Sequence, residues 1–434
     1  MSPITIGLIG IGVLLVAFII RMPLAFAMAF VGFCGFVYLT TPEAGFSVLS
    51  RTIFEQFSSF PLSAIPLFIL MGSYAYASGI SSKLYQTAYT WIGQLRGGLT
   101  MATIVACSGF AAICGSSTAT AATMGKIALP EMKKYNYSDT LAAGSVAAAG
   151  SLGILIPPST IFIVYGIMTE QSIGKLFIAG VLPGILLSLL FILTVAFICR
   201  RNPAAGPQGD HTSWREKFAS LTGVVDTIIL FCGTIGGLFV GFFTPTQAGA
   251  VGAAGAIVIG LARRQLTWQG FLEASKDALR TACMVICIIT GATIFGKFMA
   301  VSTLTFAAAG WVEGLPFPPL AIMGVIIIIY FVGGCFMDSM ALIVLTLPVI
   351  FPIVQRLGFD PIWFGVIIVL VAEMGVITPP VGTNVFVIKG VAGDIPLETI
   401  FKGIFPFLVA LLVCAAIIVA FPKISTFLPS LISY

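Results

Sequence analysis

The sequence has few charged residues, a single histidine and no pairing pattern among its cysteines. Only 9% of the 434 residues are charged and 59% are hydrophobic, whereas soluble domains carry about a quarter charged residues. A soluble fold is therefore excluded, because such a chain cannot cover itself with polar side chains. Apolar runs of about twenty residues recur along the chain, each long enough to cross a bilayer as a helix. We predict an all-α polytopic membrane protein in a lipid bilayer.

The single histidine and the scattered cysteines also exclude several kinds of catalytic and metal-binding site. His211 lies in a polar stretch rich in Pro and Gly, so a histidine-based metal centre or a buried catalytic triad is not expected. The nine cysteines form no disulfide or zinc spacing. No Gly-x-x-x-x-Gly-Lys-Ser/Thr loop occurs, so the chain is not expected to hydrolyse ATP. We predict neither an enzyme, nor an organic cofactor, nor a nucleic-acid partner, and we attribute the net charge of +5 to basic cytoplasmic loops.

The chain also repeats itself. Pro157-Pro158 recurs as Pro379-Pro380 at an offset of 222 residues, and Leu129-Pro130 recurs as Leu347-Pro348 at an offset of 218. Each half has five apolar spans, and an odd number of crossings inverts the second half relative to the first. Inverted repeats that meet near the membrane midplane are typical of secondary transporters.

We therefore predict about ten transmembrane helices in two inverted repeats, with one apolar stretch in each half that turns back. The first repeat covers 1–199, a polar cytoplasmic linker covers 200–222, and the second repeat covers 223–434. The spans are expected at 4–20, 24–40, 61–78, 138–167 and 174–199, and at 223–242, 245–262, 281–299, 362–388 and 404–421. Amphipathic helices on the cytoplasmic surface are expected at 81–96 and 267–280.

The distribution of basic residues predicts the orientation. With the N-terminus outside, sixteen of the 21 Lys and Arg residues face the cytoplasm and five face the periplasm. Both termini are then predicted to be periplasmic, and the protein is expected in the bacterial inner membrane.

Two stretches combine membrane depth with residues that break helices. Cys114–Thr120 is followed about 35 residues later by Ser151–Thr160, and Gly333–Ser339 is followed at a similar distance by Glu373–Asn384. Each Pro-Pro pair removes two amide donors, so each helix should be interrupted, and unwound backbone is tolerated at this depth only beside a cavity. Carbonyl and hydroxyl oxygens there suit a small hard cation such as sodium. The alternative is that the prolines only kink the helices while Ser and Thr pack between them.

Asp338 and Glu373 are the two acidic residues expected at membrane depth. An intramembrane carboxylate is a functional hypothesis because its charge is costly there. Asp338 either neutralises a cation or caps the helix that follows it. Glu373 is either a structural hydrogen-bond partner or a proton site, and Lys126 is interpreted as an interface charge.

At these residues the chain resembles the large membrane subunit of tripartite ATP-independent periplasmic (TRAP) transporters. The resemblance spans essentially the whole chain. The motifs that carry it are specific when taken together, although any one of them alone would be weak. It is carried by Ile65–Gly72, Gly115–Thr120, Gly153–Ser159, Ser172–Phe177, Phe243–Ala248, Met337-Asp338 and Ile377–Gly382.

The resemblance implies an elevator mechanism, in which a transport domain with two re-entrant hairpins, at about 98–125 and 317–347, moves against a scaffold and is driven by sodium. Its sodium sites would fall on Ser116, Ser117, Ser151, Gly153 and Pro157, and on Gly334, Asp338, Gly375, Thr378 and Pro379. For the substrate, a small organic anion such as a carboxylate, sugar acid or sulfonate, we expect contacts with Thr118, Ser159, Ser339, Thr383 and Asn384.

Two partners are also implied, a periplasmic substrate-binding protein and a small four-helix membrane subunit. One position departs from the family pattern. The helix before the second Pro-Pro pair usually carries Asn where this chain has Val371. A side chain of this helix is therefore not expected to bind the ion at that position. The alternative function is a self-sufficient sodium-coupled carboxylate symporter without a binding protein.

Overall fold

The computed structural model describes residues 2–20 and 22–431, and these ranges contain helices and turns but no strand. The predicted all-α fold class is confirmed. The helices of the first half are α1 (Pro3–Ile19), α2 (Leu24–Leu39), α3 (Pro42–Phe57), α4 (Ala64–Ala77), α5 (Ile80–Ile92), α6 (Gly98–Cys114), α7 (Ser117–Lys134), α8 (Asp139–Gly150), α9 (Leu152–Leu155), α10 (Thr160–Thr169) and α11 (Ile173–Arg201). Those of the second half are α12 (Trp214–Ser220), α13 (Thr222–Phe231), α14 (Gly237–Phe239), α15 (Pro245–Ala262), α16 (Trp268–Val301), α17 (Leu304–Glu313), α18 (Pro319–Phe336), α19 (Ser339–Arg356), α20 (Pro361–Val376), α21 (Thr383–Ala392), α22 (Leu397–Ala420) and α23 (Lys423–Ser430).

Eight helical segments of the described ranges are long and apolar enough to cross a membrane, and the bent pair formed by α3 and α4 gives a ninth. The multi-pass character is therefore confirmed. The count differs from the expected ten spans plus two hairpins for two reasons. Both α18 and α19, which form one hairpin, are long enough to span, with 18 residues each. Conversely α1, α2 and α20 have only 16 or 17 residues.

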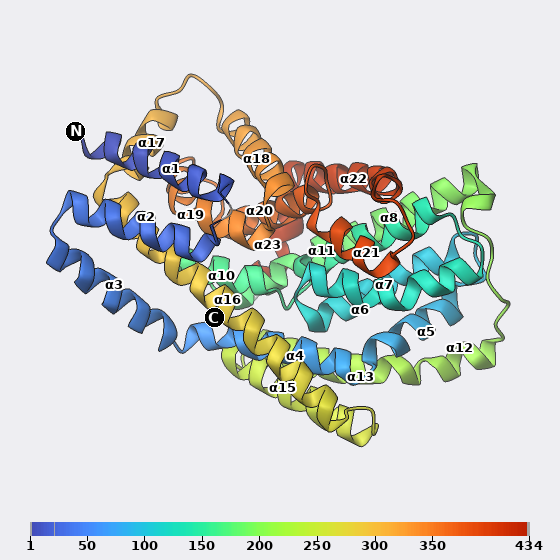
Figure 1. Ribbon diagram of the computed structural model, residues 1–434. Helices are drawn as coiled ribbons and strands as arrows, with labels where there is room; N and C mark the ends of the chain where they lie inside the picture. Colours follow the sequence, from blue (N-terminus) through green and yellow to red (C-terminus); the bar gives the residue numbers. More distant parts are fainter. Residues whose placement is uncertain (1, 21, 432–434) are drawn as a thin grey trace.

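One expectation about the helices was wrong, and one helix was not expected. The surface helix expected at 267–280 and the span expected at 281–299 are one continuous 34-residue helix, α16. The predicted boundary rested on charge, and neither Gly nor Pro lies between residues 271 and 290 to end a helix. The sequence analysis also missed α3, which precedes α4 at a bend of 52°. Figure 1 shows α16 running past α2, α3 and α4, with α1, α2, α3 and α17 gathered at one end of the molecule.

The hairpins and the linker differ in extent from the expected bounds. The first hairpin, α6–α7, reaches Lys134 rather than 125, and the second, α18–α19, reaches Arg356 rather than 347. Their second arms continue through Pro130, Pro348 and Pro352, because a proline inside a membrane helix need not end it. Helix α11 continues into the expected linker and α12 begins inside it, so only about 202–213 connects the two halves without an α-helix.

The connection between the halves is held against the protein at several points. The amide of Gly97 donates to the carbonyl of Gly206 at 2.8 Å, and the amide of Gly209 donates to that of Gly93 at 2.9 Å. The hydroxyl of Tyr137 donates to the carbonyl of Pro207 at 2.7 Å. This segment therefore ties the turn between α5 and α6 to the turn that ends the first hairpin.

Glycines allow the helices to pack closely, as is common in membranes. A Cβ built on Gly32 of α2 would lie 2.7 Å from the backbone of Phe295 in α16. A Cβ on Gly144 of α8 would lie 2.3 Å from the backbone of Gly403 in α22. At both crossings the two backbones touch without an intervening side chain.

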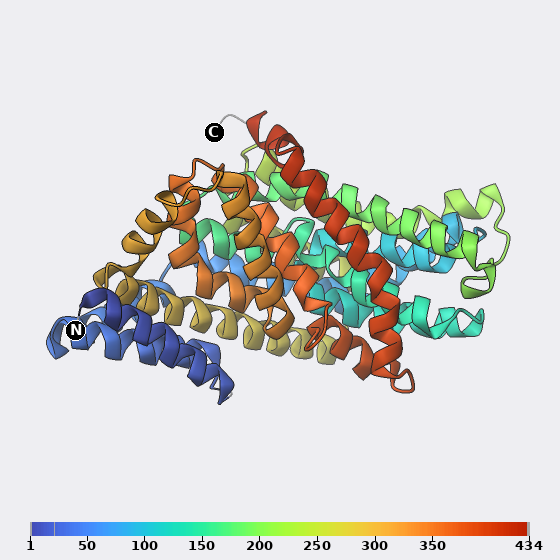
Figure 2. The ribbon, with the colours of Figure 1, turned by 90° about the horizontal axis from the view of Figure 1, so that it is seen from above.

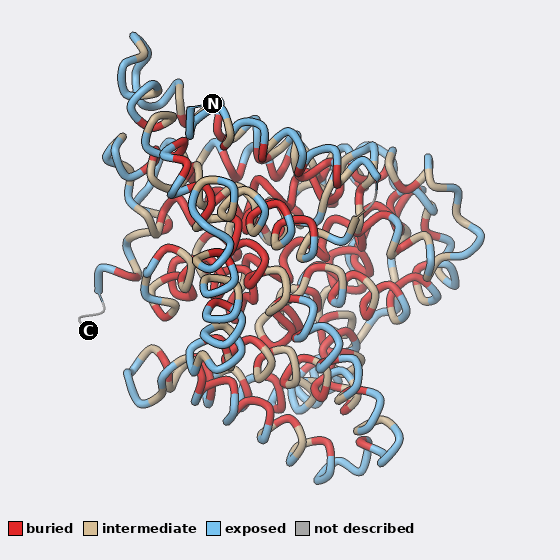
Figure 3. The backbone as a smooth tube through the Cα atoms, turned by 60° about the vertical axis from the view of Figure 1, so that its left-hand side comes forward, coloured by how far each residue is buried: buried red, intermediate tan, exposed pale blue. Residues whose placement is uncertain are grey.

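The two broken helices form the interior of the molecule. Every residue from Leu141 to Gly150 in α8 and from Trp363 to Val376 in α20 is buried. Figure 3 shows buried backbone concentrated inside the molecule and exposed backbone on its rim, and Figure 2 shows the N-terminal helices at one end of it. The first interruption, around Pro157-Pro158, therefore lies inside the protein, where unwound backbone is shielded from lipid. The second interruption begins inside the protein, but its two prolines, Pro379 and Pro380, are exposed.

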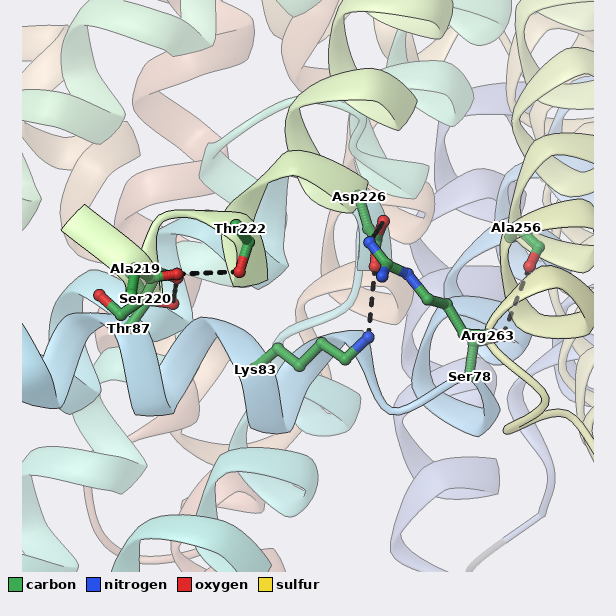
Figure 4. Close-up of polar contacts among 9 residues, drawn as sticks. All are labelled: Ser78, Lys83, Thr87, Ala219, Ser220, Thr222, Asp226, Ala256 and Arg263. Carbon is green, nitrogen blue, oxygen red and sulfur yellow. Dashed lines mark hydrogen bonds and ion pairs between the residues drawn. The ribbon is translucent and has the colours of Figure 1, made fainter. Parts of the chain in front are cut away.

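An ion cluster outside this interior joins three helices (Figure 4). Asp226 of α13 is 4% exposed and accepts from Arg263, which caps α15, at 2.9 Å and from Lys83 of α5 at 3.4 Å. The hydrogen bond from Arg263 to Asp226 raises the pKa of the guanidinium above its ordinary value. The buried carboxylate thus has two cationic partners, and its cluster connects α5, α13 and α15.

Candidate functional site

The two hairpins turn in similar ways at their tips. In the first hairpin α6 ends at Cys114, Gly115 takes a left-handed conformation with φ of 67°, and the Ser116 hydroxyl caps α7 by accepting from the amide of Ala119 at 3.4 Å. In the second hairpin Asp338 caps α19, and its Oδ1 accepts from the amide of Met340 at 3.0 Å. The capping role of Asp338, one of the two interpretations of this residue, is thus observed. Each tip presents an oxygen-bearing cap and the start of a helix.

The first tip packs against the first break, which we define as residues 151–159 between α8 and α10. The hydroxyl of Thr160 donates to the carbonyl of Gly115 at 3.0 Å. A Cβ on Gly153 would lie 2.4 Å from the carbonyl oxygen of Ser116. Only glycine therefore allows the break to approach the tip this closely. The contact brings together Ser116 and Gly153, two of the residues predicted for the first sodium site.

The second tip packs against the second break, residues 377–382 between α20 and α21. The amide of Val381 donates to the carbonyl of Cys335 at 3.1 Å. A Cβ on Gly334 would lie 2.7 Å from the carbonyl oxygen of Ala372, next to Gly375. Gly334 and Gly375, both predicted for the second sodium site, are thus in direct contact.

Glu373 connects the two tips. It lies in α20, is 1% exposed, and its Oε1 accepts from the hydroxyl of Ser339 at 2.8 Å and from that of Ser117 at 3.4 Å. Ser117 and Ser339 are the first residues of α7 and α19, so one carboxylate oxygen joins equivalent positions of both hairpins. Its Oε2 has no hydrogen-bond partner among the described residues.

A cavity of about 690 Å³ opens beside these tips. One wall belongs to the hairpins and α20 and includes Ser116, Ser117, Thr118, Asp338, Ser339 and Glu373. The facing wall belongs to α4 and α16. A cavity of this size accommodates a small organic molecule.

The predicted site residues divide into three groups. Ser116, Ser117, Thr118, Asp338 and Ser339 line the cavity. A second group lies at the breaks or on the helices beside them and does not line the cavity; it comprises Ser151, Gly153, Pro157, Ser159, Gly334, Gly375, Thr378 and Pro379. Most of these residues are buried, but Thr378 is half-buried and Pro379 is exposed.

The third group, Thr383 and Asn384, begins α21 and does not line the cavity. Asn384 is fully buried, and its amide nitrogen donates to the carbonyl of Ala147 at 3.5 Å. Asn384 therefore faces the protein interior and not the cavity.

Sequence reasoning missed the scaffold side of the cavity. Glu273, Asp277 and Thr281 of α16 line it, and their spacing of four residues places them on one helix face. That spacing was the available signal, but it was interpreted as a surface helix. Lys126 of α7, interpreted as an interface charge, also lines the cavity, and its side chain is exposed there.

The donor set of the tips fits a hard cation. Its atoms are carbonyl, hydroxyl and carboxylate oxygens, and Oε2 of Glu373 is a buried acceptor without a partner in the described part of the chain. In the part of the chain that the structure describes, no three His, Cys, Asp or Glu side chains cluster as ligands of a transition metal.

Comparison with protein families matches residues 11–424 to the tripartite ATP-independent periplasmic transporter, DctM component. The C4-dicarboxylate TRAP transporter large permease protein DctM of Pseudomonas aeruginosa is 36% identical over 395 residues, covering 91% of this chain and 92% of the relative. The sialic acid TRAP transporter large permease protein SiaM of Vibrio cholerae is 33% identical, covering 94% and 95%. Among solved structures, the YdaH transporter of Alcanivorax borkumensis superimposes with a TM-score of 0.63 at 15% identity, covering 87% of this chain and 88% of that one, so the likeness concerns the fold.

Proposed function

Because this chain belongs to the DctM component family of tripartite ATP-independent periplasmic transporters, we propose that it carries a small organic anion through the bacterial inner membrane by symport with sodium. The family membership makes it a transporter permease and not an enzyme. The observation that supports the proposal is the meeting of both hairpin tips at one cavity between the hairpins and the scaffold helices α4 and α16.

The tips supply the groups for ion and substrate binding. Sodium would be held by carbonyl and hydroxyl oxygens around Ser116 and Gly153 at the first tip, and around Gly334, Asp338 and Gly375 at the second. Ser117, Ser151, Pro157, Thr378 and Pro379 complete the proposed ion sites. The organic anion would occupy the cavity, where the hydroxyl of Thr118 and the first amides of α7 are suited to a carboxylate. Ser339 lines the same cavity, and its hydroxyl oxygen remains an acceptor while its proton is donated to Glu373.

The geometry also supports an elevator movement. The hairpins and broken helices contact one another directly through glycine backbones, so they can move as one body. The cavity lies between this body and α4 and α16. Sliding of the body along these helices would carry the tips, with ions and substrate, from one side of the membrane to the other.

Two partners complete the proposed transporter. A periplasmic binding protein would deliver the substrate, and a small four-helix membrane subunit would cover part of the lipid-facing scaffold. Relatives are named for C4-dicarboxylate and sialic acid, which are both organic anions. We propose that the substrate here belongs to the same broad class.

Reconstitution in proteoliposomes tests the proposal. The chain and its small subunit would be reconstituted, and uptake of radiolabelled C4-dicarboxylates and sialic acid would be measured with an inward gradient of sodium or of potassium. Each measurement is made with and without the binding protein, and protein-free vesicles serve as the control. Uptake that requires both sodium and the binding protein supports the proposal. Uptake with sodium alone favours a self-sufficient symporter, and equal uptake in potassium contradicts sodium coupling.

A further inference from the structure

The buried charges of the protein are compensated in different ways. Within residues 2–20 and 22–431, the buried charged side chains are Lys217, Asp226 and Glu373. Asp226 is paired with Lys83 and Arg263, and the ammonium of Lys217 lies 5.1 Å from the centre of the Trp214 ring. Glu373 has no described Lys or Arg within ion-pair distance. A buried carboxylate without a cationic partner carries a large desolvation cost.

The surroundings of Glu373 supply oxygens rather than a positive charge. Oε1 accepts from the hydroxyls of Ser117 and Ser339, and each hydroxyl oxygen keeps lone pairs when it donates its proton. Oε2 is buried and has no described partner, and the residue lines the cavity. One negative charge surrounded by neutral oxygen donors matches one monovalent hard cation.

We propose that the Glu373 carboxylate and the hydroxyl oxygens of Ser117 and Ser339 form a third sodium-binding position between the two hairpin tips. It shares Ser117 with the ion sites assigned above and Ser339 with the proposed substrate contacts. The choice of sodium rests on the proposed sodium symport. An ion at this position contacts residues that begin α7 and α19 and a residue of α20, so it holds both tips to the same helix. Its occupancy therefore couples the two outer ion sites, which makes sodium binding cooperative.

The test uses sodium titration of uptake by the reconstituted complex. Glu373→Gln keeps the size of the side chain and one acceptor oxygen, but it removes the charge and replaces the second oxygen by an NH2 donor. We expect the sodium concentration for half-maximal uptake to rise about tenfold or more, as for the loss of a charged ligand, and the Hill coefficient for sodium to fall by about one. Glu398→Gln, the same change at an exposed position in the first turn of α22, is the matched control and should leave both values unchanged.

A second measurement does not depend on transport. The melting temperature of the purified complex is recorded in sodium, potassium or choline chloride at equal ionic strength. Sodium should raise the melting temperature of the wild type more than potassium does, and Glu373→Gln should lose part of this difference. If Glu373→Gln does not accumulate in the membrane, Ser339→Ala replaces it, with a smaller rise in the sodium requirement expected.

The outcomes separate this inference from the proposed function. Sodium-independent uptake by the wild type contradicts the symport itself. Sodium-dependent uptake in the wild type, with the same sodium affinity and Hill coefficient in Glu373→Gln, overturns only the additional site, because glutamine reproduces a carboxyl group that is already neutral. Unchanged sodium affinity in Ser339→Ala likewise overturns it.

Discussion

The backbone of Gly375 in α20 lies against that of Gly334 in α18, so that a Cβ on Gly375 would fall 2.4 Å from the Gly334 carbonyl carbon. No side chain separates the second hairpin from the helix that carries its break. Because of this contact, the hairpin and α20 pack as one unit. A single methyl group added at Gly375 would disrupt this packing.

Gly375→Ala should therefore destabilise the protein by about 1–3 kcal/mol, the usual cost of overpacking. Thermal unfolding of the purified chain with its small subunit measures the effect. Gly390→Ala in α21 is the matched control, because a Cβ there meets nothing within 4 Å. That substitution should be neutral or stabilising by up to about 1 kcal/mol, since alanine favours the helix. Equal melting temperatures for the two variants would contradict the close contact.

Ser116→Ala and Thr378→Ala should weaken the sodium dependence of uptake more than they lower the amount of folded protein. Both residues belong to the proposed ion sites, and the Thr378 hydroxyl already donates to the carbonyl of Met374 at 2.6 Å, which leaves its lone pairs for an ion. Uptake against sodium concentration gives the first quantity, and fluorescence-detected size-exclusion chromatography gives the second. Thr194→Ala removes a comparable bond within α11, to the carbonyl of Leu190 at 2.8 Å, and serves as the control. Equal losses in uptake and folded protein would favour a packing role.

Asp226→Asn should destabilise the scaffold by about 2 kcal/mol, because it leaves Lys83 and Arg263 without their shared carboxylate. The figure lies below the usual 3–5 kcal/mol for breaking a buried pair, since Arg263 is 46% exposed and partly solvated. The melting temperature at low and high salt measures the change. Asp394→Asn, whose carboxylate is 91% exposed and pairs with Lys133 at 3.6 Å, should have almost no effect. A similar small effect for both would show that the buried cluster does not brace the scaffold.

Tyr137→Phe should loosen the connection between the two halves. The hydroxyl of Tyr137 donates to Pro207 and accepts from the amide of Leu99 at 3.2 Å, so its loss leaves two partly buried groups unpaired at a cost of about 1–3 kcal/mol. Limited proteolysis should cut the 206–213 segment faster in this variant. Tyr38→Phe, at a side chain that is 68% exposed, is the control. Unchanged cleavage would argue that the backbone bonds at Gly206 and Gly209 hold the segment alone.

The sequence predicted features that depend on local residues. The Pro-Pro pairs and the Gly/Ser-rich turns located the interrupted helices and the hairpin tips, because helix breakers act on their own backbone. The ends of the second hairpin arms were misplaced because the prolines at 130, 348 and 352 look like breakers but lie within helices. The continuity of α16 was missed for the opposite reason, since a change from charged to apolar residues does not end a helix.

Contacts between distant residues could not be predicted in this way. Ser117 meets Glu373 across 256 residues of sequence, and no periodicity connects them. Glu373 was recognised as an intramembrane acid, but its position between the two tips depends on how both hairpins fold back on α20. The cavity wall on α16 was missed because its acidic residues are also what a surface helix would carry.

The length of α16 decides where water reaches the cavity. Its 34 residues extend about 51 Å, whereas hydrocarbon is only about 30 Å thick, so the helix must tilt strongly or protrude. Its charged first part, with Glu273 and Asp277, is the part that cannot remain in lipid, and these two residues are exposed and line the cavity. We therefore expect water to reach the hairpin tips from the side of the membrane on which α16 begins. A thiol-specific, membrane-impermeant reagent applied to that side should modify a cysteine placed at 277, whereas the same reagent on the opposite side should not.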